Sequence, residues 1–221
     1  MKTIVISQKL SAILPDFHVG VLSFQATPQP YIEGSPLDTY LKKLQSSIQQ
    51  QYQLADVLKI PNILAGRNAY KALGKDPSRY RLAVESLYRR IVKGNPLYRI
   101  NDIVDIGNVL SLQTMRSTAV LDEDQIVGET ITIRIGRQEP YEGIGRGPLN
   151  VENMPLYCDE VGPFGSPTSD TQRTAITDNT TKVLVLIISF NGYTNLEEDL
   201  QLAKTLYERY SNAQNFTWGI F

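Results

Sequence analysis

An unbroken apolar run, VLVLIISF at residues 183–190, limits the folds open to this chain more than any other feature of its 221 residues. Successive side chains of a strand point to opposite faces of the sheet, so a strand without polar alternation must be covered on both faces. We therefore expect a central strand over residues 182–190. The run is too short to cross a bilayer, which takes about 20 apolar residues. The opening MKTIVISQKL also has too short an apolar stretch for a signal-peptide core.

Periodic patterns predict helices mainly before residue 94 and strands mainly after it. Apolar residues at helical spacing favour helices over residues 7–14, 36–48, 61–73 and 196–210. Ser35 is expected to cap the second of them, and Asn195 together with Glu198 the last. Short extended segments bounded by glycine and proline predict strands at residues 3–6, 18–26, 103–106, 130–135, 156–159 and 182–190. With no repeat or linker between them, these elements predict one α+β domain over residues 1–221.

Histidine and cysteine each occur once, as His18 and Cys158, and this excludes several kinds of site. A lone cysteine forms no internal disulfide and fits a reducing compartment, so we expect a cytoplasmic protein. A Ser, His and Asp triad needs a histidine base, but His18 stands at the start of a predicted strand. We interpret both His18 and Cys158 as structural residues. No metal and no cofactor are expected.

Two further segments resemble binding loops only at first sight. Gly143, Gly145 and Gly147 are spaced like a phosphate-binding loop, but Pro148 takes the place of the last glycine and no helix follows. A flexible hairpin loop is the better interpretation. The acidic residues 122–124 lack the spacing of a calcium loop and are interpreted as a solvated turn.

Residues 78–94 carry the strongest helical pattern in the chain. Apolar side chains follow the 3.6-residue period from Tyr80 to Val92, with Asp76 and Pro77 expected to start the helix and Gly94 to end it. The basic side chains around the opposite face are Arg79, Arg81, Arg89, Arg90 and Lys93. Two interpretations stay open: a polyanion contacts this face, or ion pairs with Glu85 make it an ordinary solvated surface.

Two polar segments are candidates for a functional site. In VDIGNVLSL, Asp105, Gly107 and Asn108 lie between a predicted strand and an expected helix start, where backbone amides and the Asn108 side chain can converge on an anion or a ribose. The second segment, residues 169–182, comes directly before the buried strand. Its candidate side chains are Ser169, Asp170, Thr171, Arg173, Thr174 and Thr177. Polar residues at the end of a central strand often line a cleft, although a hydroxyl-rich loop can instead satisfy its own backbone.

The C-terminal NFTWGIF places Phe216, Trp218 and Ile220 on one side of an extended segment. This side packs on its own domain, or it docks on a second subunit and forms a homo-oligomer.

Five segments of the chain, taken in their order along the sequence, resemble the tRNA-editing domain of the phenylalanyl-tRNA synthetase beta subunit, its B-three/B-four module. The resemblance rests on ESLYRRIVKG, VDIGNVLSL, GETITIRIG, YCDE and SDTQRTAITDNTTKVLVL, and covers about residues 60–189. It implies mixed β-sheets that enclose a small pocket, flanked by helices, and hydrolysis of the ester of tRNA mischarged with tyrosine. The chain is too short to hold the separate catalytic subunit, so it is not expected to charge tRNA by itself.

The family pattern is only partly present at the pocket that the resemblance implies. Asn108, Asp105 and Thr180 match it. The position of the family's pocket histidine, however, aligns with Ala119, and the position of the acid that hydrogen-bonds the tyrosine hydroxyl aligns near Leu186. A site built to hydrogen-bond a hydroxyl gains up to ~10⁴-fold discrimination from it. Tyrosine specificity is therefore not expected.

The leading hypothesis is a hydrolase that acts in trans on the aminoacyl ester of mischarged tRNA. Its expected catalytic residues are Asp170, Thr174 and Asn108. Its expected substrate-binding residues are Ser169, Thr171, Arg173 and Thr177. Its expected tRNA-backbone contacts are Arg81, Arg89, Arg90 and Lys93. The alternatives are a non-catalytic module that binds tRNA, other RNA or an amino acid, and a small-molecule esterase or amidase.

Overall fold

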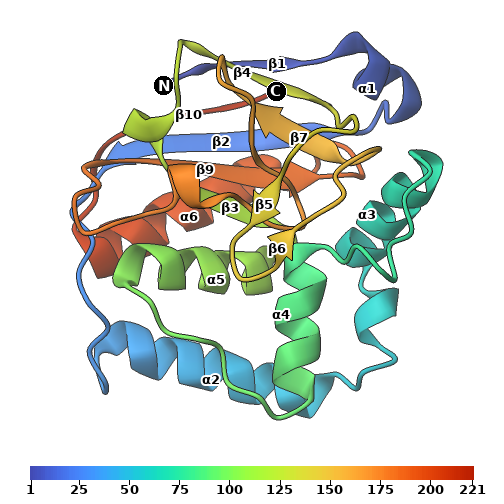
Figure 1. Ribbon diagram of the computed structural model, residues 1–221. Helices are drawn as coiled ribbons and strands as arrows, with labels where there is room; N and C mark the ends of the chain where they lie inside the picture. The colour runs from blue at the N-terminus through green and yellow to red at the C-terminus, as the bar shows by residue number, and fades with distance from the viewer.

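The computed structural model describes residues 1–221 and contains six α-helices and three β-sheets (Figure 1). The helices are α1 (Gln8–Ile13), α2 (Pro36–Gln51), α3 (Pro61–Ala72), α4 (Ala83–Val92), α5 (Asp102–Thr114) and α6 (Leu196–Ser211). The strands are β1 (Thr3–Ile6), β2 (His18–Gln25), β3 (Thr118–Asp122), β4 (Thr130–Ile135), β5 (Glu142–Gly143), β6 (Gly147–Pro148), β7 (Pro155–Cys158), β8 (Pro163–Gly165), β9 (Lys182–Ser189) and β10 (Gln214–Ile220). The predicted α+β fold class is confirmed.

Two four-stranded sheets and a set of helices form the layers of the molecule. The upper sheet has the strand order β1-β4-β7-β8 and is mixed, because β1 pairs with β4 in parallel and the other pairs are antiparallel. The middle sheet has the order β10-β2-β9-β3 and is antiparallel. Helices α5 and α6 lie below the middle sheet, and α2 and α4 lie below α5 (Figure 1).

Strand β9 lies inside the middle sheet, as its apolar run predicted. Its side chains alternate between two buried clusters: Val183, Val185 and Ile187 pack with the helices. Leu184, Leu186 and Ile188 pack with the upper sheet. Both faces of the strand are therefore covered, which is why it needs no polar residue on either one.

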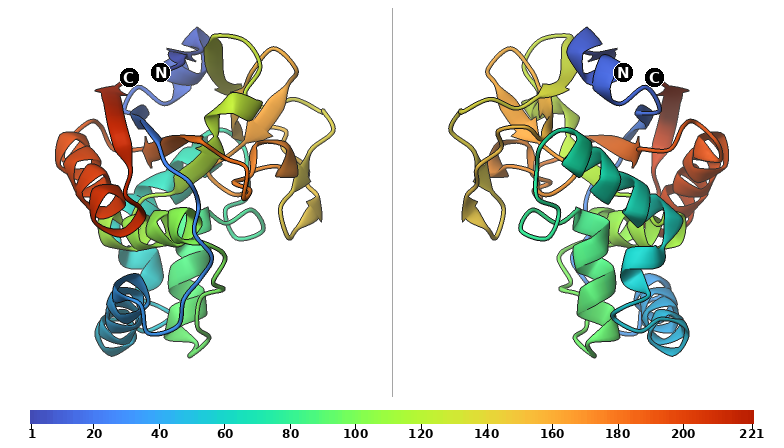
Figure 2. Two further views of the ribbon diagram at one scale, coloured as in Figure 1. Left: turned by 90° about the vertical axis from the view of Figure 1, so that its left-hand side faces the viewer. Right: turned by 90° about the vertical axis from the view of Figure 1, so that its right-hand side faces the viewer.

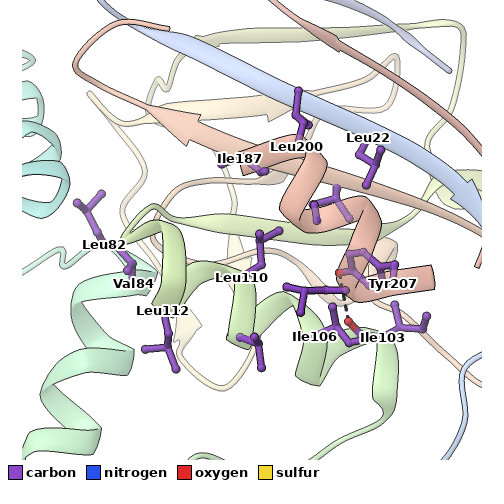
Figure 3. Packing of buried hydrophobic residues seen from close by; sticks show 14 of the residues in the cluster. Leu22, Leu82, Val84, Ile103, Ile106, Leu110, Leu112, Ile187, Leu200 and Tyr207 are labelled. Atoms are coloured by element: carbon purple, nitrogen blue, oxygen red, sulfur yellow. Dashed lines mark hydrogen bonds between the residues drawn. The ribbon is translucent and has the colours of Figure 1, made fainter. Parts of the chain in front are cut away.

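Helix α5 corrects the strand expected over residues 103–106. Asn101 caps the helix, because its side-chain oxygen accepts a hydrogen bond from the backbone N–H of Val104 at 2.9 Å. Figure 3 shows α5 between α6, β9 and α4, with Ile103, Ile106 and Leu110 all buried. A helix that is buried on most sides shows little contrast between an apolar and a polar face, so its short apolar run is easily mistaken for a strand.

The basic helix α4 starts later than expected. Asp76 caps a turn instead, accepting a hydrogen bond from the Ser78 backbone at 2.8 Å, and the helix begins at Ala83, whose N–H donates to Pro167 O at 2.8 Å. Its end is as predicted. Gly94 has φ = 79°, and the N–H groups of Gly94 and Asn95 donate to Ile91 O and Arg90 O, which is the Schellman arrangement.

Of three other local predictions, one is confirmed and two are wrong. The Ser35 cap of α2 is confirmed, since its side chain accepts from Asp38 N at 3.2 Å. The Asn195 cap of α6 is wrong, because Asn195 has φ = 65° and its side chain makes no capping bond. Residues 122–124 are not a solvated turn: Glu123 is 1 % exposed and lies 3.3 Å from Lys182 Nζ.

The aromatic tail forms β10, which pairs antiparallel with β2. Phe216 and Ile220 pack on the buried cluster below the middle sheet, whereas Trp218 keeps 38 % of its surface exposed. The tail therefore packs on its own domain.

None of the helices combines the length and the apolar character that crossing a membrane demands.

We predict that Gly107→Ala destabilises the fold although alanine is the better helix former. A Cβ on Gly107 would overlap Val120 Cγ2 of β3, where α5 packs against the middle sheet, and Val120 is stiff at χ1. Overpacking of this kind costs about 1–3 kcal/mol, more than the roughly 0.5–1 kcal/mol of helix propensity gained. Denaturant unfolding measures the change. The double variant Gly107→Ala/Val120→Ala should lose less than the sum of the single losses, and a stabilised Gly107→Ala would contradict the packing described.

Candidate functional site

The loop between β8 and β9 holds Asp170 in a fixed place through its backbone. The Asp170 carbonyl accepts a hydrogen bond from Ile144 N at 2.9 Å, and the Thr171 N–H donates to Phe164 O of β8 at 2.9 Å. Ser166 Oγ tightens the same turn by accepting from the backbone N–H of Ser169 at 3.1 Å. The loop is thus tied both to β8 and to the hairpin formed by β5 and β6.

The Asp170 carboxyl group is the most perturbed acid in this region. Burial raises its pKa to about 7, opposed only by the hydrogen bond from Ser166 N to Oδ1 at 3.4 Å. No cation is placed to stabilise the charged form. Gly165 is required beside it, because a Cβ there would lie 2.7 Å from Asp170 Oδ1. A carboxyl that titrates near neutral pH can act as a general base or acid.

Asp170 and Asn108 line one cavity of ≈ 390 Å³ between α5, β3, the hairpin tip and the Asp170 loop. The polar lining comes from Asn108, Thr118, Asp170 and Gln172. The rest is mostly apolar and includes Ile144 and Ile176. An apolar hollow with a few converging polar groups is the usual form of a small-ligand site.

Asn108 reaches this cavity from the second turn of α5, not from the helix start that was expected. The backbone amides of residues 105–108 are inside the helix, so they are not free to bind an anion. Gly107 supplies close packing against Val120. Helix α5 therefore forms the floor of the cavity, and the side-chain amide of Asn108 is the polar group that it presents to a ligand.

A second hollow of ≈ 260 Å³ lies on α4 and has no apolar lining. Its lining residues are Arg81, Ser86, Arg89, Arg90, Lys93 and Asn95, and we call it the basic depression. The Arg90 guanidinium stacks 4.0 Å from the Tyr98 ring centroid and its Nε donates to Pro96 O, so it is oriented without being neutralised.

The Glu85 ion pairs that were considered for this face exist, but they lie beneath it. Glu85 is fully buried and accepts hydrogen bonds from Arg67 at 2.9 Å and from Arg89 at 2.8 Å. Among the basic residues of the depression, only Arg89 has a carboxylate partner within 4 Å. Arg81, Arg90 and Lys93 keep their charge available to an anion.

A model of the B3/4 domain family matches residues 65–216, which is more than half of the chain. The chain belongs to the B3/4 domain family. Among solved structures, it is similar to an N-terminal fragment of the phenylalanyl-tRNA synthetase beta-subunit from Pyrococcus horikoshii, with 12 % identity and a TM-score of 0.47. That match covers 97 % of this chain and 50 % of the other, so the chain spans about half the length of that structure. The comparison with curated proteins gave no match.

In this B3/4 domain the positions equated with the family's histidine and acid are away from the cavity. Ala119 of β3 and Leu186 of β9 are direct register partners, and both belong to the apolar cluster between the two sheets. Asn108 lies on the other side of the middle sheet, with the helices. The apolar side chains at 119 and 186 are thus explained by packing.

The other two positions that match the family pattern are also outside the cavity. Asp105 is buried and accepts from Arg99 Nε at 2.8 Å, and it lines a separate hollow of ≈ 190 Å³. Thr180 is buried and donates to Asp122 Oδ2 at 2.7 Å. Of the three matching residues, the B3/4 domain brings only Asn108 to Asp170.

Most of the other polar side chains of the 169–177 segment hold the loop or line its far side. Arg173 forms a bidentate pair with Asp159 at 2.8 and 2.9 Å, not with Asp170. Thr171 and Arg173 line an adjoining groove under the hairpin. The Thr174 hydroxyl is fully buried without a partner. Thr177 accepts a backbone hydrogen bond from Asn179, as a self-satisfied hydroxyl loop would, and Ser169 Oγ donates to the carbonyls of Ile144 and Asp170.

The lining residues that sequence reasoning missed include Thr118, Gln172 and Ile144. Thr118 was hidden because β3 had not been predicted. Ile144 was hidden because the glycine-rich segment was interpreted as a flexible hairpin loop; it does form a hairpin, but its tip bends over the cavity. Gln172 lies in the candidate segment 169–182, and its closeness in sequence to Asp170 could have identified it as a lining residue.

Proposed function

We propose that this B3/4 domain hydrolyses, in trans, the aminoacyl ester of a mischarged tRNA. One observation carries the proposal: Asp170, with a pKa of about 7, shares a largely apolar cavity with the amide of Asn108. An ester is already activated, so one base and one oxyanion donor are enough to accelerate its hydrolysis. The ordered sequence segments that resemble the editing domain of the phenylalanyl-tRNA synthetase beta subunit support aminoacyl-tRNA as the substrate class.

The reaction follows from the two side chains. A water molecule gives a proton to the Asp170 carboxylate as its oxygen bonds to the ester carbonyl carbon. The negative charge that develops on the carbonyl oxygen is stabilised by the N–H of the Asn108 amide. When the tetrahedral intermediate collapses, the bond to the ribose oxygen breaks and that oxygen takes the proton back from Asp170. The products are a free amino acid and an uncharged tRNA.

In this proposal the basic depression binds the tRNA backbone. Arg81, Arg90 and Lys93 are positioned to contact phosphates of the tRNA backbone, and such contacts are weakened by salt because counterions are released on binding. The molecule carries a formal net charge of −1, so this local patch, not the overall charge, attracts the polyanion.

A specific observation favours the second candidate, a module that binds tRNA without turnover. The amides of α5 near Asn108 are used within the helix, so the cavity lacks the paired backbone donors of a strong oxyanion hole. A binding module would keep its salt-dependent RNA affinity when Asp170 is changed.

A panel of aminoacyl-tRNAs incubated with the purified protein tests the proposal. We expect faster release of the amino acid than in buffer for at least one mischarged tRNA, and little effect on correctly charged ones. Binding of tRNA with no hydrolysis of any member would establish the binding module instead. Hydrolysis of simple esters with indifference to tRNA would point to a small-molecule esterase.

A further inference from the structure

The hairpin formed by β5 and β6 stands out from the body of the molecule (Figure 2), and close to its turn it is hydrogen-bonded to the Asp170 loop. Its strands pair Glu142 with Pro148 and Gly143 with Gly147, and Gly143 forms an isolated bridge with Thr171. The three residues 144–146 make the turn, closed by a hydrogen bond from Arg146 N to Gly143 O at 3.0 Å. The turn is thereby held at a defined place beside the cavity.

Arg146, at this tip, is directed to α4. Its Nη2 donates to Ser86 Oγ at 3.3 Å, and Ser86 is one of the residues that line the basic depression. Arg146 is exposed overall, but partial desolvation of its guanidinium and the nearby Arg81 both lower its pKa. Two guanidinium groups that approach one another without a carboxylate between them repel, and an anion that binds both removes that repulsion.

The two turn residues on either side of Gly145 lie next to different hollows. Ile144 lines the Asp170 cavity, and Arg146 reaches the rim of the basic depression. Their Cα atoms are two residues apart along the chain, which limits the separation to about 7 Å. A phosphate held by Arg146 is therefore close to the mouth of the cavity that receives the ester.

We propose that Arg146, together with Arg81, binds a phosphodiester near the acceptor end of the tRNA and so positions the terminal ribose ester at the Asp170 cavity. Arg146 is then a positioning residue that connects the basic depression to the chemistry. Arginine suits this role because its planar guanidinium can give two parallel hydrogen bonds to one phosphate. The part that concerns the ester rests on the proposed function, whereas the phosphate contact does not.

The test compares Arg146→Ala with Arg209→Ala, a matched control that removes an exposed arginine from α6 beside a different hollow. We expect Arg146→Ala to weaken binding of uncharged tRNA by roughly two- to tenfold at low salt and to reduce the slope of log K against log salt by about 0.7–0.9. Arg209→Ala should change neither. Arg146→Lys should recover part of the affinity because the charge returns.

A second substrate separates positioning from chemistry. Hydrolysis of an aminoacyl ester of adenosine alone, which has no phosphodiester, should proceed equally in wild type and Arg146→Ala, while kcat/KM on the aminoacyl-tRNA falls. Unchanged tRNA affinity in Arg146→Ala overturns the inference, as does wild-type binding to phosphatidylserine vesicles in place of tRNA. If wild type hydrolyses neither substrate but Arg146→Ala still binds tRNA more weakly, the hydrolase proposal fails and the phosphate contact is upheld.

Discussion

Asp170→Asn lowers the rate of aminoacyl-ester hydrolysis by about 10²–10⁴-fold, the usual contribution of a positioned general base. Asparagine keeps the shape and the hydrogen bond from Ser166 N but cannot accept a proton from water. In wild type the rate should rise as the pH passes about 7, because Asp170 must be deprotonated to act. Single-turnover assays with a mischarged tRNA over a range of pH measure both effects.

The same substitution provides its own folding control. The pKa of Asp170 is raised from 3.8 to about 7 in the folded state, so between these values the folded protein binds a proton that the unfolded chain has released. Wild-type stability therefore falls as the pH rises through this window. Asp170→Asn lacks the proton and should be more stable than wild type at pH 7 by about 1–3 kcal/mol, but not at pH 4. An Asn variant that is both active and no more stable would remove Asp170 from the site.

Leu186→Glu destabilises the domain by more than about 4 kcal/mol, and it does not create selectivity for tyrosine. Leu186 is completely buried between Val21 and Ala119 in the middle sheet and faces the upper sheet. A carboxylate there has no partner and no water. Because a domain of this kind is stable by only about 5–15 kcal/mol, much of that margin is lost. Chemical denaturation monitored by circular dichroism measures the loss.

Leu186→Met is the matched control, since it keeps the volume and should cost less than about 1.5 kcal/mol. A Leu186→Glu variant with nearly wild-type stability would mean that this face of β9 borders a polar pocket. In that case the site would have to be sought between the two sheets, where the family resemblance first located it.

Patterns with one dominant physical cause were predicted well from the sequence. The run at residues 183–190 required burial on both faces, and β9 has it. The Ser35 cap of α2 and the Gly94 end of α4 are local features that depend on neighbouring residues only. The family could be recognised because several such segments occur in a fixed order.

What failed depended on contacts distant in the chain. Helix α4 begins where Pro167 O accepts the Ala83 N–H, a contact that no local pattern contains. Glu85 and Glu123 are charged residues whose burial is made possible by Arg67 and Lys182, far away in the sequence. At the site, the polar composition of residues 169–177 identified the right loop, but only tertiary packing selected Asp170 from it to share a cavity with Asn108.

The two-sided burial of β9 leaves the strand's alignment with its neighbours undetermined by hydrophobicity. A shift by one residue would exchange the side chains of the two clusters and still leave every one of them in an apolar setting. Polar anchors at the strand's ends remove this freedom: Lys182 meets Glu123 at one end, and Ser189 accepts from Arg116 Nη1 at 2.6 Å at the other. The apolar interior of β9 thus stabilises the sheet in either alignment, and the polar contacts at its two ends determine which of two nearly equivalent pairings the strand adopts.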